Sequence, residues 1–122
     1  LIPDSGGTYF LPRLIGMQKA MALMMTGDKV SAEEAERMNM IYKVFEDELF
    51  EEESIKLTEQ LAKMPTRGLG LTKKAVNLGL FNSLEDQLDL EESLQTEAGE
   101  TDDFTEGVNA FIQKRPAEFK GR

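Results

Sequence analysis

Glycine and proline residues divide this chain into segments of helical length, and this punctuation constrains the fold more than any other feature of the sequence. Apolar residues recur at helical spacing before Gly16 and again before Gly27. Glycine commonly ends a helix because it adopts a left-handed backbone without steric cost. Pro65 and Pro116 end two later stretches, since proline disfavours the helical conformation of the residue before it. The pattern predicts a mainly α chain.

Residues that cap helices mark where several of these helices begin. Ser31 and Glu34 have the spacing of a capping box, which predicts a short helix that runs to about Arg37. Acidic residues after Glu46 suit the positive end of a helix dipole and predict the start of a long helix. The expected helices cover residues 8–15, 17–26, 32–37, 47–64 and 66–81, a stretch that starts at residue 83, and residues 101–115. A brief extended segment is expected around residues 41–45.

The later helices carry apolar stripes that are wide for a chain of 122 residues. Such stripes are normally buried against another apolar surface, so we expect packing on another part of the protein, on other subunits, or on both. Gly68, Gly70 and Gly79 fall inside the helix expected over residues 66–81. Each costs a helix about 1 kcal/mol relative to alanine, and we expect close packing against another element to offset that cost.

Charge and composition exclude several classes of function. The chain has 14 basic and 23 acidic residues, and its net charge of −9 disfavours nucleic acid as a partner. It contains no Cys and no His, so disulfides, thiolate chemistry, serine–histidine triads and the usual zinc sites are not expected, and no metal ligand is assigned. No apolar run is long enough to cross a bilayer, and we expect a cytoplasmic protein with no membrane partner. Because Cys and His are absent, any proton transfer by this chain must use a carboxylate, a tyrosine or a lysine.

A carboxylate near the start of the chain is the main candidate for chemistry. Asp4 stands just before the pair Gly6-Gly7, where an apolar helical stretch begins. The glycines allow a ligand or another backbone to approach closely, and Ser5 and Thr8 offer hydroxyls that could cap the helix. Asp4 is either an N-cap or an acid–base residue that faces a substrate. From spacing alone the N-cap is the more common use of such a residue.

Blocks of sequence spread along the whole chain follow one another in a characteristic order. They comprise residues 1–16, 26–35, 38–45, 65–77, 87–91 and 106–115. This order resembles the C-terminal part of the enoyl-CoA hydratase/isomerase (crotonase) superfamily. The similarity is greatest to the branch that contains the 1,2-epoxyphenylacetyl-CoA isomerases of bacterial phenylacetate degradation.

The resemblance implies a fold and a division of the chain. It indicates the C-terminal helical portion of a crotonase (ClpP/crotonase-like) fold, and we expect the N-terminal spiral of strands and helices to precede Leu1. Residues 1–47 would form the end of the crotonase core with the active-site helix. Residues 48–122 would form a C-terminal helical oligomerisation region, so a homotrimer or hexamer is expected. A segment of this kind alone is expected to be inactive, because the donors that stabilise the enolate oxygen would lie outside it.

The resemblance also gives Asp4 a role. At the matching position hydratases commonly have glycine, whereas the epoxyphenylacetyl-CoA isomerases and some dienoyl-CoA isomerases use an aspartate for proton transfer. Asp4 is therefore the catalytic candidate of an acyl-CoA isomerase. Three alternatives stay open: an enoyl-CoA hydratase whose catalytic residues lie upstream, a dehalogenase in which the aspartate is a nucleophile, and a helical oligomerisation module.

Two further residues match superfamily positions that contact coenzyme A. Phe111 and Lys114 are the substrate-binding candidates, with the lysine expected at a phosphate. Coenzyme A is carried as part of the acyl-CoA substrate, so no separate cofactor is assigned. Lys114 and Arg115 would supply the local positive charge that an acidic chain needs to bind this anion. Without the resemblance, an apolar helix face followed by cations at a helix C-terminus would explain these residues equally well.

Overall fold

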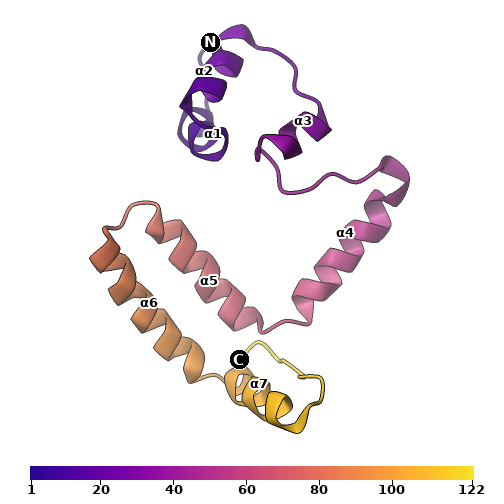
Figure 1. Ribbon diagram of the computed structural model, residues 1–122, viewed down its shortest axis with the longest axis vertical. Coiled ribbons are helices and arrows are strands. Elements are labelled where there is room, and N and C mark those ends of the chain that lie inside the picture. The colour runs from indigo at the N-terminus through magenta and orange to yellow at the C-terminus, as the bar shows by residue number, and fades with distance from the viewer. The chain divides into compact units, whose positions relative to one another are not determined.

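The computed structural model describes residues 1–122 and contains seven α-helices and no strand. The helices are α1 (Gly7–Ile15), α2 (Met17–Thr26), α3 (Ala32–Arg37), α4 (Asp47–Ala62), α5 (Thr66–Gly79), α6 (Leu84–Gly99) and α7 (Asp102–Gln113) (Figure 1). The predicted mainly α chain is confirmed, and each expected helix is present. The segment around residues 41–45 consists of bends and irregular backbone without a strand.

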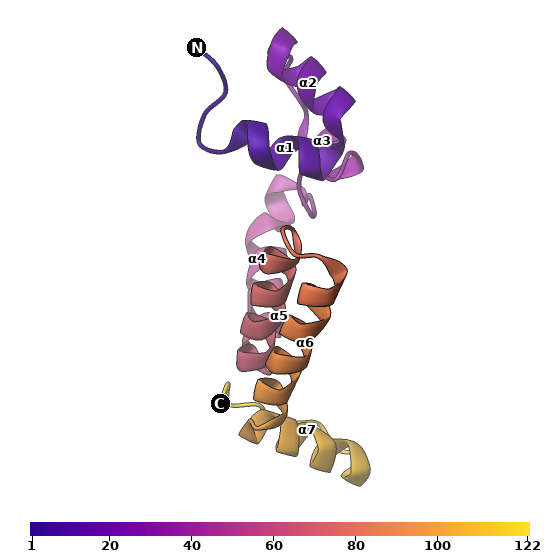
Figure 2. The ribbon, with the colours of Figure 1, turned by 90° about the vertical axis from the view of Figure 1, so that its left-hand side faces the viewer.

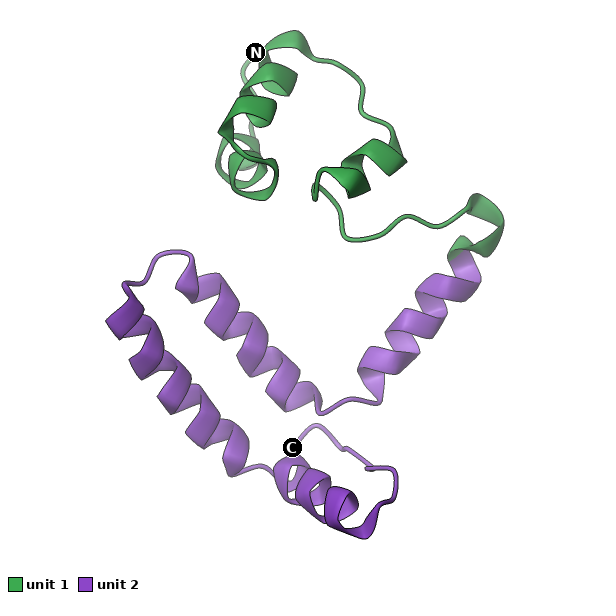
Figure 3. Cartoon of the chain, viewed as in Figure 1, with its two compact units in different colours: residues 1–50 green, residues 51–122 purple.

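The chain divides into two compact units, residues 1–50 and residues 51–122 (Figure 3). The division lies within the second turn of α4. The sequence interpretation put its boundary after residue 47, and the roles that it gave to the two parts remain predictions. No helix in the chain combines the length and the apolar character that a membrane span requires.

Unit 1 is built from short helices with well-defined ends. Gly16 joins α1 to α2 with φ of 85° and accepts a hydrogen bond from Ala20 N–H at 3.1 Å, and Ala20 is fully buried. Gly27 ends α2 in the left-handed conformation, with φ of 70°. The Ser31 hydroxyl accepts a hydrogen bond from Glu34 N–H at 3.2 Å, so the predicted N-cap of α3 is confirmed.

Unit 2 contains a helical hairpin, in which α5 and α6 lie side by side in both Figures 1 and 2. Leu71 on α5 and Leu94 on α6 are its buried leucines. The expected close packing at a glycine occurs at Gly79, where an added Cβ would lie 3.0 Å from Gln87 Oε1. At Gly68 and Gly70 nothing in this chain lies within 4 Å of an added Cβ, and close packing there stays a prediction.

The residues after α7 fold back along this helix and are held by the carboxylate of Asp103. Asp103 is only 3% exposed, and its oxygens accept hydrogen bonds from Lys120 N–H at 2.6 Å and Gly121 N–H at 2.8 Å. Asp103 N–H donates to the Arg122 carbonyl oxygen at 3.1 Å. Gly121 has φ of 75°, and a Cβ there would clash with Thr66 Oγ1. The tail therefore connects the start of α7 to the start of α5.

Large apolar side chains remain on the surface of both units. The buried hydrophobic residues are mostly alanines, and no large side chain is completely enclosed. Exposed examples on four helices are Leu14, Met21, Phe50 and Phe104. These faces match the apolar stripes of the sequence, and the helices of this chain leave them uncovered.

Replacing Asp103 by alanine tests the anchoring of the tail. We expect Asp103→Ala to lower the free energy of unfolding by about 2–4 kcal/mol, because two hydrogen bonds to a buried carboxylate are lost. The neighbouring Asp102 is exposed and lies 3.6 Å from the Arg122 guanidinium, so Asp102→Ala should cost about 1 kcal/mol or less. Urea denaturation of both variants measures the difference. Equal losses would contradict the anchoring role of Asp103.

Candidate functional site

Asp4 begins a tight turn that leads into α1. Gly7 N–H donates to the Asp4 carbonyl oxygen at 2.8 Å, which closes the turn over Ser5 and Gly6. Both central residues have positive φ, 51° at Ser5 and 83° at Gly6, as in a type I′ turn. A left-handed conformation costs a residue with a side chain about 1–2 kcal/mol. The backbone is therefore locally strained beside the candidate carboxylate.

The Asp4 carboxylate does not cap α1. The N-cap residue is Gly6, and no side chain caps the helix. Tyr9 N–H and Phe10 N–H both donate to the Gly6 carbonyl oxygen at 2.9 Å. Asp4 is exposed and accepts a single hydrogen bond, from the Ser5 hydroxyl at 3.3 Å. The N-cap interpretation of Asp4, and the expected caps from Ser5 and Thr8, were wrong, because the glycine at position 6 starts the helix by itself.

Aromatic contacts fix the first turns of α1 behind this turn. The Tyr9 and Phe10 rings meet edge to face with centroids 5.1 Å apart, and the Arg13 guanidinium lies 3.6 Å from the centre of the Tyr9 ring. Arg13 also donates to the Tyr9 carbonyl oxygen at 2.9 Å. An added Cβ at Gly6 would come within 2.9 Å of the Phe10 ring. Glycine at this position thus satisfies both the backbone angle and the packing.

Phe111 lies in unit 2 and borders an apolar cavity of about 420 Å³. The Phe111 side chain is 86% exposed. Phe119 reaches the same cavity from the returning tail and would lie 3.5 Å from a Cβ at Gly107. The cavity is otherwise lined by Pro65, Gly68, Ala98, Thr101, Asp103, Phe104, Gly107 and Val108. Its polar lining groups are few, so it suits an apolar or aromatic group.

Lys114 ends α7 in a left-handed conformation, with φ of 54°. Its N–H donates to the Phe111 carbonyl oxygen at 3.2 Å, and the next N–H, of Arg115, donates to the Ala110 carbonyl oxygen at 3.1 Å. This turn stops the helix two residues before the expected end at residue 115. The Lys114 side chain is exposed and belongs to none of the salt bridges of unit 2.

Arg115 does not share the role expected for it. Its guanidinium forms a two-pronged pair with the Glu106 carboxylate, with distances of 2.6 Å from Nη1 to Oε1 and 2.8 Å from Nη2 to Oε2. Glu106 Oε1 also accepts the Glu118 N–H at 2.8 Å. The positive charge of Arg115 is therefore neutralised within the chain. Of this adjacent pair of cations, Lys114 is the one without a carboxylate partner.

The same contacts change the titration of Glu106. The Arg115 guanidinium, and after it the Glu118 N–H, lower the pKa of Glu106 to about 2. Glu106 in turn raises the pKa of Arg115. Sequence reasoning gave neither Glu106 nor Asp103 a role. Their spacing of three residues puts two carboxylates on one face of the helix, and this was the feature of the sequence that could have indicated a shared role.

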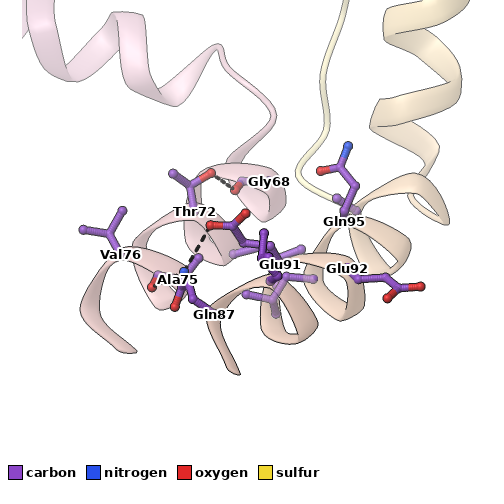
Figure 4. A pocket seen from close by; sticks show the side chains of 12 residues that line it. Gly68, Thr72, Ala75, Val76, Gln87, Glu91, Glu92 and Gln95 are labelled. Atoms are coloured by element: carbon purple, nitrogen blue, oxygen red, sulfur yellow. Dashed lines mark hydrogen bonds between the residues drawn. The ribbon is translucent and has the colours of Figure 1, made fainter. Parts of the chain in front are cut away.

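A larger groove of about 590 Å³ lies along the α5–α6 hairpin (Figure 4). Gln87 reaches across it and donates to the Ala75 carbonyl oxygen at 3.3 Å and to Glu91 Oε1 at 3.2 Å. The charged residues that line the groove are Glu91 and Glu92. A phosphate group would be repelled there. No cluster of His, Cys, Asp or Glu in the chain could hold a metal ion.

Comparison with known proteins places these features in a family context. The family model for enoyl-CoA hydratase/isomerase matches residues 1–122. The chain is 46% identical over its full 122 residues to 1,2-epoxyphenylacetyl-CoA isomerase of Escherichia coli (strain K12), of which it covers 47%. It is 45% identical over the same length to a Rhodobacter capsulatus protein named "Probable enoyl-CoA hydratase", of which it covers 48%.

A solved structure gives the same result for the fold. The crystal structure of enoyl-CoA hydratase from Bacillus anthracis matches with a TM-score of 0.94 and 35% identity, over 100% of this chain and 47% of that chain. The seven helices thus correspond to the C-terminal helical part of a crotonase fold, as expected. The chain spans about half the length of the curated relatives it matches.

A matched pair of glycine substitutions tests the turn beside Asp4. Gly6→Ala should lower the free energy of unfolding by about 1–2 kcal/mol, because alanine is strained at positive φ and its Cβ meets the Phe10 ring. Gly7→Ala is the control, since Gly7 lies in the helix and an added Cβ would make an ordinary 3.6 Å contact with Pro3. It should be neutral or stabilising by up to about 1 kcal/mol. The same loss in both variants, measured by urea denaturation, would contradict this assignment.

Acid titration tests the Glu106–Arg115 pair. Because the pKa of Glu106 is about 2 in the folded protein and about 4.3 in an unfolded chain, the pair stabilises the fold fully above that unfolded value. The stabilisation should be lost as the pH falls toward the folded pKa. We expect the stability difference between the wild type and Glu106→Gln to shrink below about pH 4.3. A difference that does not change as the solution is acidified would contradict the assigned ion pair.

Proposed function

The chain belongs to the enoyl-CoA hydratase/isomerase family, and on that premise we propose that the protein is an acyl-CoA isomerase in which the Asp4 carboxylate transfers a proton next to a CoA thioester. The observation that carries the proposal is the state of this carboxylate. It is exposed, it does not cap α1, and its one hydrogen bond comes from Ser5. A general base needs oxygen lone pairs that are not already committed to the fold.

The proposed reaction moves a proton along the acyl chain without net gain or loss. Asp4 takes a proton from the carbon beside the thioester carbonyl, and the electron pair of that C–H bond moves onto the carbonyl oxygen as an enolate. Backbone N–H donors of the crotonase fold, outside this chain, would stabilise the enolate oxygen. Asp4 then returns the proton farther along the conjugated system, and a double bond shifts. Isomerisation of a ring epoxide is the related reaction of the branch that this sequence resembles.

Two similarities support isomerisation. The first is the 46% identity to 1,2-epoxyphenylacetyl-CoA isomerase of Escherichia coli. The second is the aspartate itself, which stands at a position where hydratases of the superfamily commonly have glycine. Phenylacetate breakdown is the proposed context, by similarity to that relative.

Phe111 and Lys114 are the proposed contacts of the CoA part of the substrate. Phe111 offers an exposed aromatic ring next to an apolar cavity, and Lys114 offers an ammonium group without a carboxylate partner. A free cation matters here because the chain carries a net charge of −9 and would repel an anionic ligand elsewhere. Since the superfamily lysine that Lys114 resembles often acts from a neighbouring subunit, a homotrimer or hexamer is part of the proposal. The exposed apolar helix faces support such an assembly.

Hydration is the second candidate, and a specific similarity favours it. The Rhodobacter capsulatus relative named as a hydratase is 45% identical, almost as similar as the isomerase. In a hydratase, glutamates upstream of this chain would activate water and Asp4 would not be the base. The two candidates therefore differ in whether Asp4→Asn abolishes the reaction: an isomerase would lose it, and a hydratase would keep it.

Proton NMR of the full-length protein with a 3-enoyl-CoA in D2O distinguishes these reactions. We expect double-bond migration with deuterium incorporation in the wild type, and a fall in kcat of about 10²- to 10⁴-fold in Asp4→Asn, the range that general acid–base catalysis supplies. Asp28→Asn is the matched control, because Asp28 is an exposed aspartate between α2 and α3. A 3-hydroxyacyl product that persists in Asp4→Asn would identify a hydratase instead. Unchanged isomerisation in Asp4→Asn would overturn the role of Asp4.

A further inference from the structure

The cation proposed to meet coenzyme A sits on a backbone turn that lysine rarely adopts. Lys114 has φ of 54° at the C-terminus of α7. This place in a helix is usually taken by glycine, because a Cβ makes the left-handed conformation unfavourable. Something other than intrinsic preference must therefore hold Lys114 in this conformation.

The contacts around Arg115 supply that constraint. Arg115 N–H donates to the Ala110 carbonyl oxygen at 3.1 Å, which closes the turn around Lys114. The Arg115 side chain donates from Nη1 to the Pro116 carbonyl oxygen at 3.0 Å and from Nε to Gln113 Oε1 at 2.8 Å. The residues on both sides of Lys114 are thus tied to one guanidinium group.

The guanidinium group is in turn fixed by Glu106, two turns earlier on α7. Both Glu106 oxygens accept from Arg115, at 2.6 Å and 2.8 Å, and the geometry of two parallel hydrogen bonds allows one orientation only. Glu106 also accepts the Glu118 N–H at 2.8 Å, beyond the turn. One carboxylate on α7 therefore holds two residues that follow Lys114, the Arg115 side chain and the Glu118 backbone.

We propose that Glu106 is a positioning residue for substrate binding: through Arg115 and Glu118 it fixes the left-handed turn at Lys114 and so directs the Lys114 ammonium group toward a phosphate of the acyl-CoA. The inference rests on the proposed function, because it assumes that Lys114 contacts this phosphate. Glu106 itself does not touch the substrate. Its loss should weaken binding of the phosphate-bearing part and leave the chemical step unchanged.

Steady-state kinetics of the full-length protein tests this role. Glu106→Gln should raise KM for an acyl-CoA about five- to tenfold, with kcat nearly unchanged, because a contact made equally in ground state and transition state is weakened. The substitution also frees the positive charge of Arg115, which by itself would attract a phosphate. A rise in KM would therefore come from lost geometry, since the change in charge acts in the opposite direction.

Two comparisons separate positioning from general damage to the fold. The effect of Glu106→Gln should vanish with the acyl-pantetheine substrate, which lacks the nucleotide phosphates, and it should vanish in a Lys114→Ala background. Glu97→Gln is the matched control, because it breaks a Glu–Arg pair with Arg67 elsewhere in unit 2 and makes the same change in charge. It should leave KM unchanged. Arg115→Lys keeps the charge but loses the two-pronged geometry, so it should reproduce the rise in KM if Glu106→Gln does not fold.

The outcomes distinguish this inference from the proposed function. If Lys114→Ala raises KM for acyl-CoA while Glu106→Gln and Arg115→Lys do not, the positioning role fails and the Lys114 contact stands. If Lys114→Ala has no effect, the contact with the phosphate fails and the positioning role fails with it. An equal loss of kcat/KM with acyl-CoA and acyl-pantetheine in Glu106→Gln would assign Glu106 to the fold alone.

Discussion

Two carboxylates on one face of α7 determine how the C-terminal end of this chain is arranged. Asp103 and Glu106 together accept hydrogen bonds from the backbone N–H groups of Glu118, Lys120 and Gly121. These bonds bring Phe119 into the apolar cavity that Phe111 borders. The nine residues after α7 form no helix or strand, and hydrogen bonds to carboxylates are among the stronger ones that can hold such a segment in one conformation. The cavity and the turn at Lys114 both depend on them.

Polar anchoring of this kind fits a chain that buries little apolar surface by itself. The completely or nearly buried hydrophobic residues are three alanines and two leucines, while large apolar side chains are exposed on most helices. Large exposed apolar faces usually mark places where a protein binds another protein surface. The ends of three helices are defined within this chain alone, by Ser31, Ser83 and Thr101 as N-caps.

Capping residues and helix-ending glycines in the sequence predicted the helices well. They did not predict which side chains pair across longer separations. Ser31 and the stops at Gly16 and Gly27 act between residues close in sequence, so their effect could be read directly. The pairing of Glu106 with Arg115 spans nine residues and a reversal of the chain. The sequence therefore suggested a free arginine where the structure has a neutralised one. The N-cap alternative for Asp4 fails for a local reason: Ser5 and Gly6 both adopt positive φ, and Gly6 takes the N-cap position of α1.

The contrast between Glu106 and Asp4 bears on which carboxylate can do chemistry. Glu106 accepts three hydrogen bonds, two from a cation, and its pKa falls to about 2. Such a carboxylate is too weakly basic to remove a carbon-bound proton near neutral pH. Asp103 is excluded for a different reason, since it is buried and bonded to the tail. Asp4 is held by neither a cation nor a backbone N–H, and it stands on a strained turn, the kind of backbone found at functional sites more often than elsewhere. Of these three carboxylates, Asp4 alone is exposed and accepts no hydrogen bond other than the one from the neighbouring Ser5 hydroxyl.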